Sequence, residues 1–143
     1  MTSRSIRVVA AVIQRDGKYL ITQRRENASL PLLWEFPGGR VEPGETDAQA
    51  LQREFTERLG AAVDVGKPVA FRRHDYEGYT VELVLYEATL VSDDALETVR
   101  VKDFRWVEVD EFSQYPFPPA DTGTLDDFQV FVGAQNPKKL PKA

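Results

Sequence analysis

The 143-residue sequence has no cysteine, a single histidine and no apolar run long enough to cross a membrane. The missing cysteine excludes disulfides and thiolate metal sites, and the lone His74 excludes a multi-histidine metal cluster. The net charge of −5 disfavours a surface that coats nucleic acid. Because the N-terminal residues also lack the layout of a signal peptide, we expect a cytoplasmic protein with no membrane segment.

One domain is expected over residues 1–135, followed by a lysine- and proline-rich flexible tail over 136–143. The strand-like segments alternate apolar residues with turn signals such as Asp16-Gly17. Strands are predicted over 6–14, 18–24, 63–65, 69–75, 79–91 and 104–107, helices over 46–59 and 122–134, and a helical turn over 109–115. This pattern favours an α+β sandwich in which a mixed sheet lies between helices.

The segment over 46–59 is the clearest predicted helix. Thr46 and Gln49 have the spacing of a capping box, and Gly60 is a typical helix stop. At about 100° per residue, one stripe of the helix is apolar and is predicted to pack on the sheet. This stripe consists of Ala48, Leu51, Phe55 and Leu59.

Two glutamates, Glu54 and Glu57, are predicted to be neighbours on the far side of this helix. Like charges three residues apart repel unless something neutralises them, and a hard divalent cation such as Mg²⁺ would do so. A solvated charged face is the alternative. The preceding Gly38-Gly39 bend favours a ligand site, because glycines let the backbone approach a ligand closely.

The segment from Gly39 to Ala61 resembles the Nudix box, G-x5-E-x7-R-E-U-x-E-E-x-G-U, in which U is an aliphatic or bulky apolar residue. Seven residues stand where the pattern requires them: Gly39, Glu45, Arg53, Glu54, Phe55, Glu57 and Gly60. The resemblance implies a Nudix-type α/β/α sandwich with a central mixed sheet. It also implies an enzyme that hydrolyses a nucleoside diphosphate linked to another group.

By the same resemblance, Mg²⁺ or Mn²⁺ is held by Glu54, Glu57 and the backbone carbonyl of Gly39. Arg53 and Glu45 complete the expected catalytic set as an ion pair that fixes the loop to the helix. One residue departs from the pattern, because Arg58 occupies the place of the second glutamate of the E-E pair. Arg58 lies four residues after Glu54 and is predicted to form an ion pair with it, which would compete with the metal.

Outside the box, the chain resembles the MutT-like branch from about residue 6 to residue 131. The resemblance implies that Arg24 contacts phosphate or ribose, and that the segment from Phe117 to Asp121 contacts the base. An ionised Asp121 accepts hydrogen bonds only and would suit the exocyclic amine of cytosine or adenine. Asp121 could equally be the N-cap of the helix over 122–134, and Arg24 a charge at a strand end. Phe71, Tyr76 and Tyr79 could stack on a base, although core or rim positions are the alternative.

Relatives often take a further carboxylate from a loop, and Glu97 is the residue predicted for this role. The expected function is Mg²⁺-dependent hydrolysis of a nucleoside triphosphate to a monophosphate and pyrophosphate. The alternatives are removal of pyrophosphate from RNA 5′ ends, cleavage of a nucleotide sugar, or a nucleotide-binding sensor with little turnover. The expected partner is the nucleotide substrate, with no stable nucleic-acid complex, and the protein is expected to be a monomer or homodimer.

Overall fold

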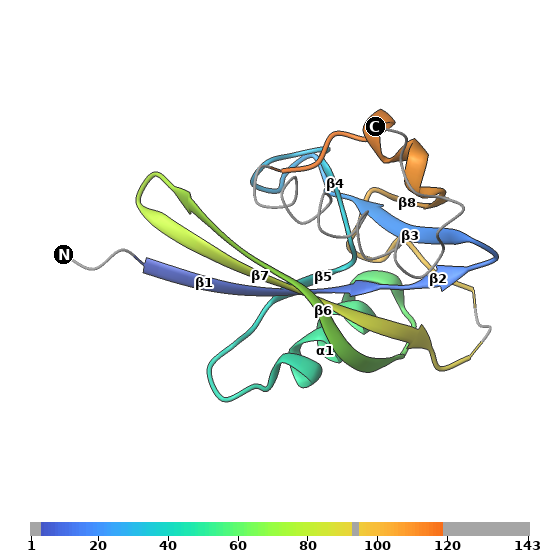
Figure 1. The fold of residues 1–143 in the computed structure, drawn as a ribbon, viewed down its shortest axis with the longest axis horizontal. Coiled ribbons are helices and arrows are strands. Elements are labelled where there is room, and N and C mark those ends of the chain that lie inside the picture. Colours follow the sequence, from blue (N-terminus) through green and yellow to red (C-terminus); the bar gives the residue numbers. More distant parts are fainter. Residues whose placement is uncertain (1–3, 93–94, 119–143) are drawn as a thin grey trace.

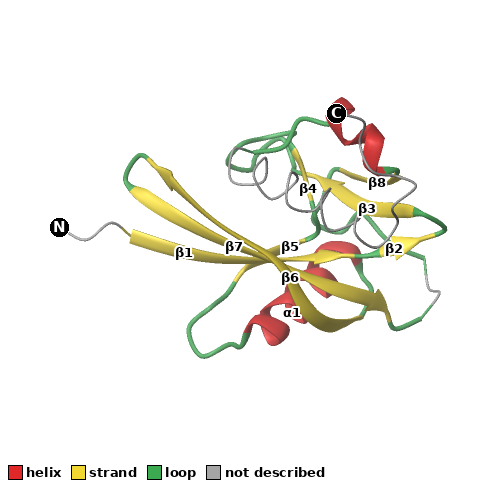
Figure 2. Ribbon diagram, viewed as in Figure 1, coloured by secondary structure: helices red, strands yellow, loops and turns green. Residues whose placement is uncertain are grey.

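The centre of the fold is a four-stranded mixed sheet in the order β5-β1-β7-β6 (Figures 1 and 2). The computed structural model describes residues 4–92 and 95–118. The strands of this sheet are β1 (Arg4–Val12), β5 (Gly38–Arg40), β6 (Val63–Tyr76) and β7 (Tyr79–Leu90). β1 and β7 run parallel over nine residue pairs, whereas β5 and β6 are antiparallel to their neighbours. The predicted mixed sheet is therefore confirmed.

A second, smaller sheet covers one face of the first. It consists of β2 (Gln14–Arg15), β3 (Lys18–Gln23), β4 (Trp34–Glu35) and β8 (Asp103–Val107), with β4 and β8 both paired to β3. The 3-10 helix η1 (Val109–Gln114) follows β8. The turn at Asp16 and Gly17 has positive φ at both residues, 52° and 77°, as a tight hairpin turn requires. This confirms the predicted hairpin.

The helix α1 (Asp47–Leu59) covers the opposite face of the central sheet (Figure 1). Its predicted ends are confirmed, because Thr46 and Gln49 form the capping box and Gly60 ends the helix with φ 68°. Alternate side chains of β1 point to opposite faces of the central sheet and pack against α1 on one face and the second sheet on the other. Val9 and Ala11 pack with α1, while Ala10 and Val12 pack toward the second sheet.

The buried side of α1 differs from the predicted stripe. Ala50 is fully buried and Ala48 is only half-buried, so the buried arc is wider and is rotated toward Ala50. At 100° per residue, Glu54 and Arg58 fall inside this arc, between Ala50 and Leu51. The predicted position of Glu54 on the far side of the helix was therefore wrong, since it faces β5 and is 12% exposed.

The long hairpin of β6 and β7 extends beyond the body of the molecule (Figure 1). β6 is one strand where two short pieces were predicted, with irregular pairing on either side of Pro68. Proline is tolerated there because β6 is an edge strand. The predicted helix over 122–134 and the tail over 136–143 lie outside the described residues. Among the described residues, no helix is long and apolar enough to span a membrane.

Candidate active site

The guanidinium of Arg53 joins the loop after β5 to the helix α1. Its Nε and Nη2 atoms donate to the two carboxylate oxygens of Glu45 at 2.7 and 2.9 Å. Nη2 also donates to the carbonyl oxygen of Arg40 at 3.0 Å. A forked pair of this kind fixes both direction and distance. The predicted ion pair between Arg53 and Glu45 is present in the structure.

Hydrogen bonds from Arg53, and then from the backbone N–H of Glu42, lower the pKa of Glu45 to about 2. Glu45 is therefore ionised throughout the neutral range. The same hydrogen bonds raise the pKa of the Arg53 guanidinium, which therefore stays charged. The loop and the helix thus stay joined at physiological pH.

The carboxylate of Glu54 lies directly against the backbone of Gly39. A Cβ atom built at Gly39 would lie 2.2 Å from Oε2 of Glu54, which is far inside van der Waals contact. Only glycine leaves room for this approach. The structure therefore brings together Glu54 and Gly39, two of the residues predicted to hold the metal ion.

Both oxygens of Glu54 are held by arginines. Oε1 accepts a hydrogen bond from Nη1 of Arg53 at 2.9 Å, and Oε2 accepts one from Nε of Arg58 at 2.8 Å. The predicted ion pair between Arg58 and Glu54 is confirmed. Glu57 is more open, with a side chain that is 43% exposed and Oε2 3.4 Å from Nη1 of Arg53.

The oxygen atoms at this site suit a hard divalent cation. Glu54, Glu57 and the carbonyl of Gly39 offer oxygen atoms only, which Mg²⁺ and Mn²⁺ prefer. Among the described residues, no cluster of three or more metal-ligating side chains exists, so a backbone oxygen and water would have to complete the coordination. Arg58 holds one of the oxygens that such a cation would use.

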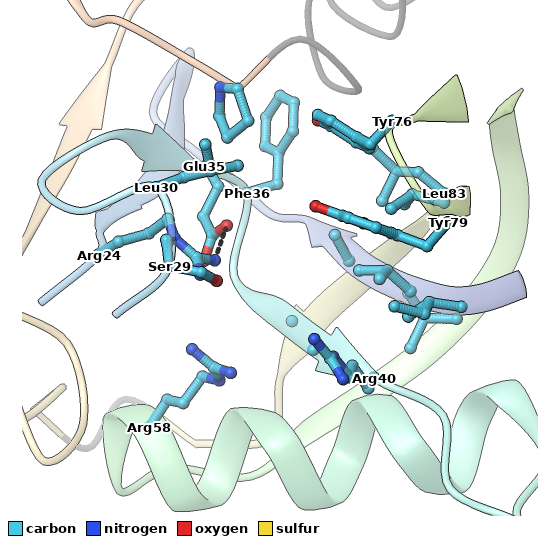
Figure 3. Close-up of a pocket in the computed structure, with 18 residues that line it drawn as sticks. Arg24, Ser29, Leu30, Glu35, Phe36, Arg40, Arg58, Tyr76, Tyr79 and Leu83 are labelled. Atoms are coloured by element: carbon cyan, nitrogen blue, oxygen red, sulfur yellow. Dashed lines mark hydrogen bonds and ion pairs between the residues drawn. The ribbon is translucent and has the colours of Figure 1, made fainter. Parts of the chain in front are cut away.

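A cleft with a volume of about 170 Å³ lies beside Gly39 (Figure 3). Three arginines from different elements line it: Arg24 after β3, Arg40 on β5 and Arg58 on α1. Tyr76 and Tyr79, at the tip of the β6–β7 hairpin, form the facing wall. Their rings stack with centroids 5.1 Å apart and an angle of 14° between the planes. The cleft thus has a cationic side and an aromatic side.

Arg24 and Glu35 form an ion pair inside the cleft, with Nη1 of Arg24 3.1 Å from Oε1 of Glu35. Arg24 also donates to the carbonyl and the hydroxyl of Ser29, at 2.7 and 3.0 Å, which closes the loop between β3 and β4. Burial raises the pKa of Glu35, although the positive charges of Arg24 and Arg58 oppose this. Leu30 in the same loop has a φ of 51°, a strained value for a branched side chain, and also lines the cleft.

Comparison with known proteins identifies the family. The family model described as "NUDIX domain" matches residues 8–127. The chain is a Nudix hydrolase. It is 39% identical to a CTP pyrophosphohydrolase of Escherichia coli (strain K12), over 92% of this chain and 97% of that protein. It is also 32% identical to an 8-oxo-dGTP diphosphatase of Haemophilus influenzae, over 85% of this chain and 89% of that protein.

Solved structures agree with this assignment. The solution structure of the E. coli ORF135 protein has a TM-score of 0.79 and 36% identity, covering 94% of this chain and 95% of that one. A MutT protein from Methanosarcina mazei Go1 has the same TM-score at 22% identity, which shows a shared fold. The predicted Nudix-type α+β fold and the enzyme class, hydrolysis of phosphoanhydride bonds, are confirmed.

Not every predicted site residue of this Nudix hydrolase reaches the cleft. Phe117 is 9% exposed and packs against Phe36 and Phe112, while its neighbour Pro118 lines the cleft. Asp121 lies outside the described residues. Phe117 therefore belongs to the core, and an effect of it on substrate would pass through Phe36, which does line the cleft.

Glu97 lies at the C-terminal end of α1. Its backbone N–H donates to the carbonyl of Leu59 at 2.9 Å, and its carboxylate lies against Gly60. The next residues of this segment continue the capping, because the N–H groups of Val99 and Arg100 both point to the carbonyl of Arg58 at 3.1 Å. The structure does not bring Glu97 to the cleft, and its role as a metal ligand stays a prediction.

Glu35 was not predicted as a site residue, and Tyr76 and Tyr79 were predicted either to stack on a base or to lie in the core or at the rim; all three line the cleft. A signal for Glu35 was present, because it is a lone charge among the apolar residues of the Leu33–Pro37 segment. The two tyrosines flank the Glu77-Gly78 turn, and two aromatic rings at the same hairpin tip are placed to stack.

The two adjacent glycines of β5, Gly38 and Gly39, should respond differently to alanine. A Cβ at Gly38 would lie 1.9 Å from the backbone oxygen of Val9, whereas at Gly39 it would meet side-chain atoms of Glu54 and no backbone atom among its three nearest neighbours. We expect Gly38→Ala to cost about 3 kcal/mol or more of unfolding free energy, and Gly39→Ala only about 1 kcal/mol. Gly39→Ala should still lower hydrolysis about 100-fold, because it displaces Glu54. Urea unfolding and turnover assays check this, and a fully active Gly39→Ala variant would contradict it.

The Glu45–Arg53 pair should contribute to acid sensitivity. The folded-state pKa of Glu45, about 2, lies below its ordinary value of 4.5, so the pair stabilises the fold above pH 4.5. This stabilisation is lost as the pH falls from 4.5 toward 2. The difference in unfolding free energy between wild type and Glu45→Gln should be constant above about pH 5.5 and shrink below it.

Urea titrations at a series of pH values measure this difference. Glu87→Gln is the matched control, because Glu87 makes no ion pair with any residue in the described part of the chain. A difference between wild type and Glu45→Gln that does not change with pH would show that the pair contributes nothing to acid sensitivity.

Proposed function

We propose that this Nudix hydrolase converts a nucleoside triphosphate to a nucleoside monophosphate and pyrophosphate, with Mg²⁺ or Mn²⁺ as cofactor. The observation that carries the proposal is the contact of Glu54 with Gly39 at the edge of a cleft that has a cationic and an aromatic side. The triphosphate of a nucleotide needs the cationic side, and its base needs the aromatic side. The near full-length similarity to a CTP pyrophosphohydrolase supports the same substrate class.

Each part of the box has a distinct role in this proposal. Glu54, Glu57 and the carbonyl of Gly39 would hold the cation, which supplies neutralisation of the phosphate charge. Glu45 and Arg53 do not touch the substrate. They are positioning residues, because their ion pair fixes the loop carrying Gly39 relative to the helix carrying Glu54.

The cleft residues would orient the substrate. Arg24, Arg40 and Arg58 face the phosphates, whose negative charge they match. A water oxygen attacks one phosphorus in line and releases a proton to solvent, the bond from that phosphorus to the bridging oxygen breaks, and pyrophosphate leaves with that oxygen. Glu57 is an exposed carboxylate on α1 and would orient the water.

The base would lie toward the hairpin tip. The ring of Tyr79 or Tyr76 offers a flat apolar surface, and stacking tolerates any base. Preference for a cytosine- or adenine-type base, including modified bases, is proposed from Asp121, which would accept a hydrogen bond from the exocyclic amine.

A second function has one specific observation in its favour. Because Arg58 occupies an oxygen of Glu54, the cation would be held less firmly, and a nucleotide sensor with little turnover would result. Turnover numbers separate the two functions. A sensor shows thermal shifts with nucleotides but releases no pyrophosphate.

Substituting the two helix carboxylates tests the proposed function. Glu54→Gln and Glu57→Gln should each lower kcat/KM for Mg²⁺-dependent pyrophosphate release by about 100-fold or more. Each change removes a charged ligand of the cation that would neutralise the phosphates. Glu87→Gln on β7 is the control and should leave the rate unchanged, since Glu87 does not line the cleft. Unchanged release by both helix variants would refute the catalytic assignment.

A further inference from the structure

Arg58 stands where the Nudix pattern has a carboxylate, so the local charge differs by two units from that of the pattern. Its side chain does not turn away into solvent. It is 29% exposed, its Nε donates to Oε2 of Glu54, and it lines the cleft. The guanidinium is therefore held at the site by an anchor on its own helix.

The anchored guanidinium keeps most of its hydrogen-bonding capacity. An arginine has five N–H donors, and the bond to Glu54 uses only the one on Nε. Within the described part of the chain, neither Nη atom of Arg58 makes a hydrogen bond. Figure 3 shows this group pointing from α1 toward the cleft. A planar pair of Nη donors matches the oxygens of a phosphate.

The other two arginines of the cleft differ in how firmly they are tied. Arg24 is held by three hydrogen bonds to Ser29 and Glu35. Arg40 is exposed and makes no ion pair with the described residues. Arg40 and Arg58 come from neighbouring elements, β5 and α1, and both point into the same space (Figure 3). Of the described residues that line the cleft with these three arginines, Glu35 is the one that is acidic.

We propose that Arg58, together with Arg40, forms a polyphosphate-binding site that does not need a metal ion. Arg58 contributes in this chain part of the positive charge that the Nudix pattern obtains from a cation held by an additional carboxylate. This inference rests on the proposed function for the identity of its ligand, the triphosphate group. It predicts that the protein binds a triphosphate with all divalent cations removed.

Isothermal titration calorimetry with inorganic tripolyphosphate in EDTA at low ionic strength tests this directly. Wild type should bind with measurable heat, and Arg58→Gln should bind about tenfold more weakly or worse, since a charged hydrogen-bonding partner is lost. Arg58→Lys keeps the charge but not the fork and should bind with intermediate affinity. Arg105→Gln is the matched control on β8, outside the cleft, and should bind like wild type.

Two readouts keep the test independent of turnover. Urea unfolding tests whether Arg58→Gln is folded. If that variant does not fold, Arg58→Lys is the second variant for the comparison. Titration with CTP in EDTA then separates the two sources of a triphosphate. Tighter binding of CTP than of tripolyphosphate would assign the site to nucleotides, and equal binding would assign it to the phosphate chain alone.

The outcomes separate this inference from the proposed function. No binding of tripolyphosphate by wild type in EDTA, or equal binding by wild type and Arg58→Gln, overturns the inference even if nucleotides are hydrolysed with Mg²⁺. Binding that depends on Arg58, in a protein that hydrolyses no nucleotide, upholds the inference and refutes the proposed function. Arg58→Glu adds a metal readout, because it should raise Mn²⁺ affinity measured by electron paramagnetic resonance.

Discussion

The arrangement of the site depends on one guanidinium, that of Arg53. It reaches three parts of the chain, because it binds Glu45 with a fork, the carbonyl of Arg40 at the end of β5, and Glu54 on its own helix. A single planar group therefore sets the distance between loop, strand and helix. Without it, the position of Glu54 over Gly39 would depend on packing and on the ion pair with Arg58.

The carboxylate of Glu54 is shared between the backbone of Gly39 and two arginines. Its carboxylate touches Gly39 on one side and binds Arg53 and Arg58 through its two oxygens. A cation at this carboxylate would compete with Arg58 for Oε2 but would leave the bonds between Arg53 and Glu45 intact. Arg58, in the place of the second glutamate of the pattern, adds a positive group to the lining of the cleft.

The box and its helix could be predicted from the sequence because their determinants are local. Caps and the salt bridge between Glu54 and Arg58 follow from spacings of three and four residues. The cleft could not be predicted in this way. Glu35 comes from β4 in the second sheet and Tyr76 from the end of β6 in the central sheet, and the packing of the two sheets brings both to the cleft. The position of Glu97 against Gly60 likewise depends on how a long segment folds back on α1.

In the proposed function, the box and the cleft together split a nucleoside triphosphate between its first and second phosphates. Phosphorus-31 NMR of CTP and a panel of other triphosphates, incubated with the protein and Mg²⁺, tests it most directly. The account predicts a nucleoside monophosphate and pyrophosphate in equal amounts, with no orthophosphate. A nucleoside diphosphate with orthophosphate, or intact nucleotide across the whole panel, would contradict it.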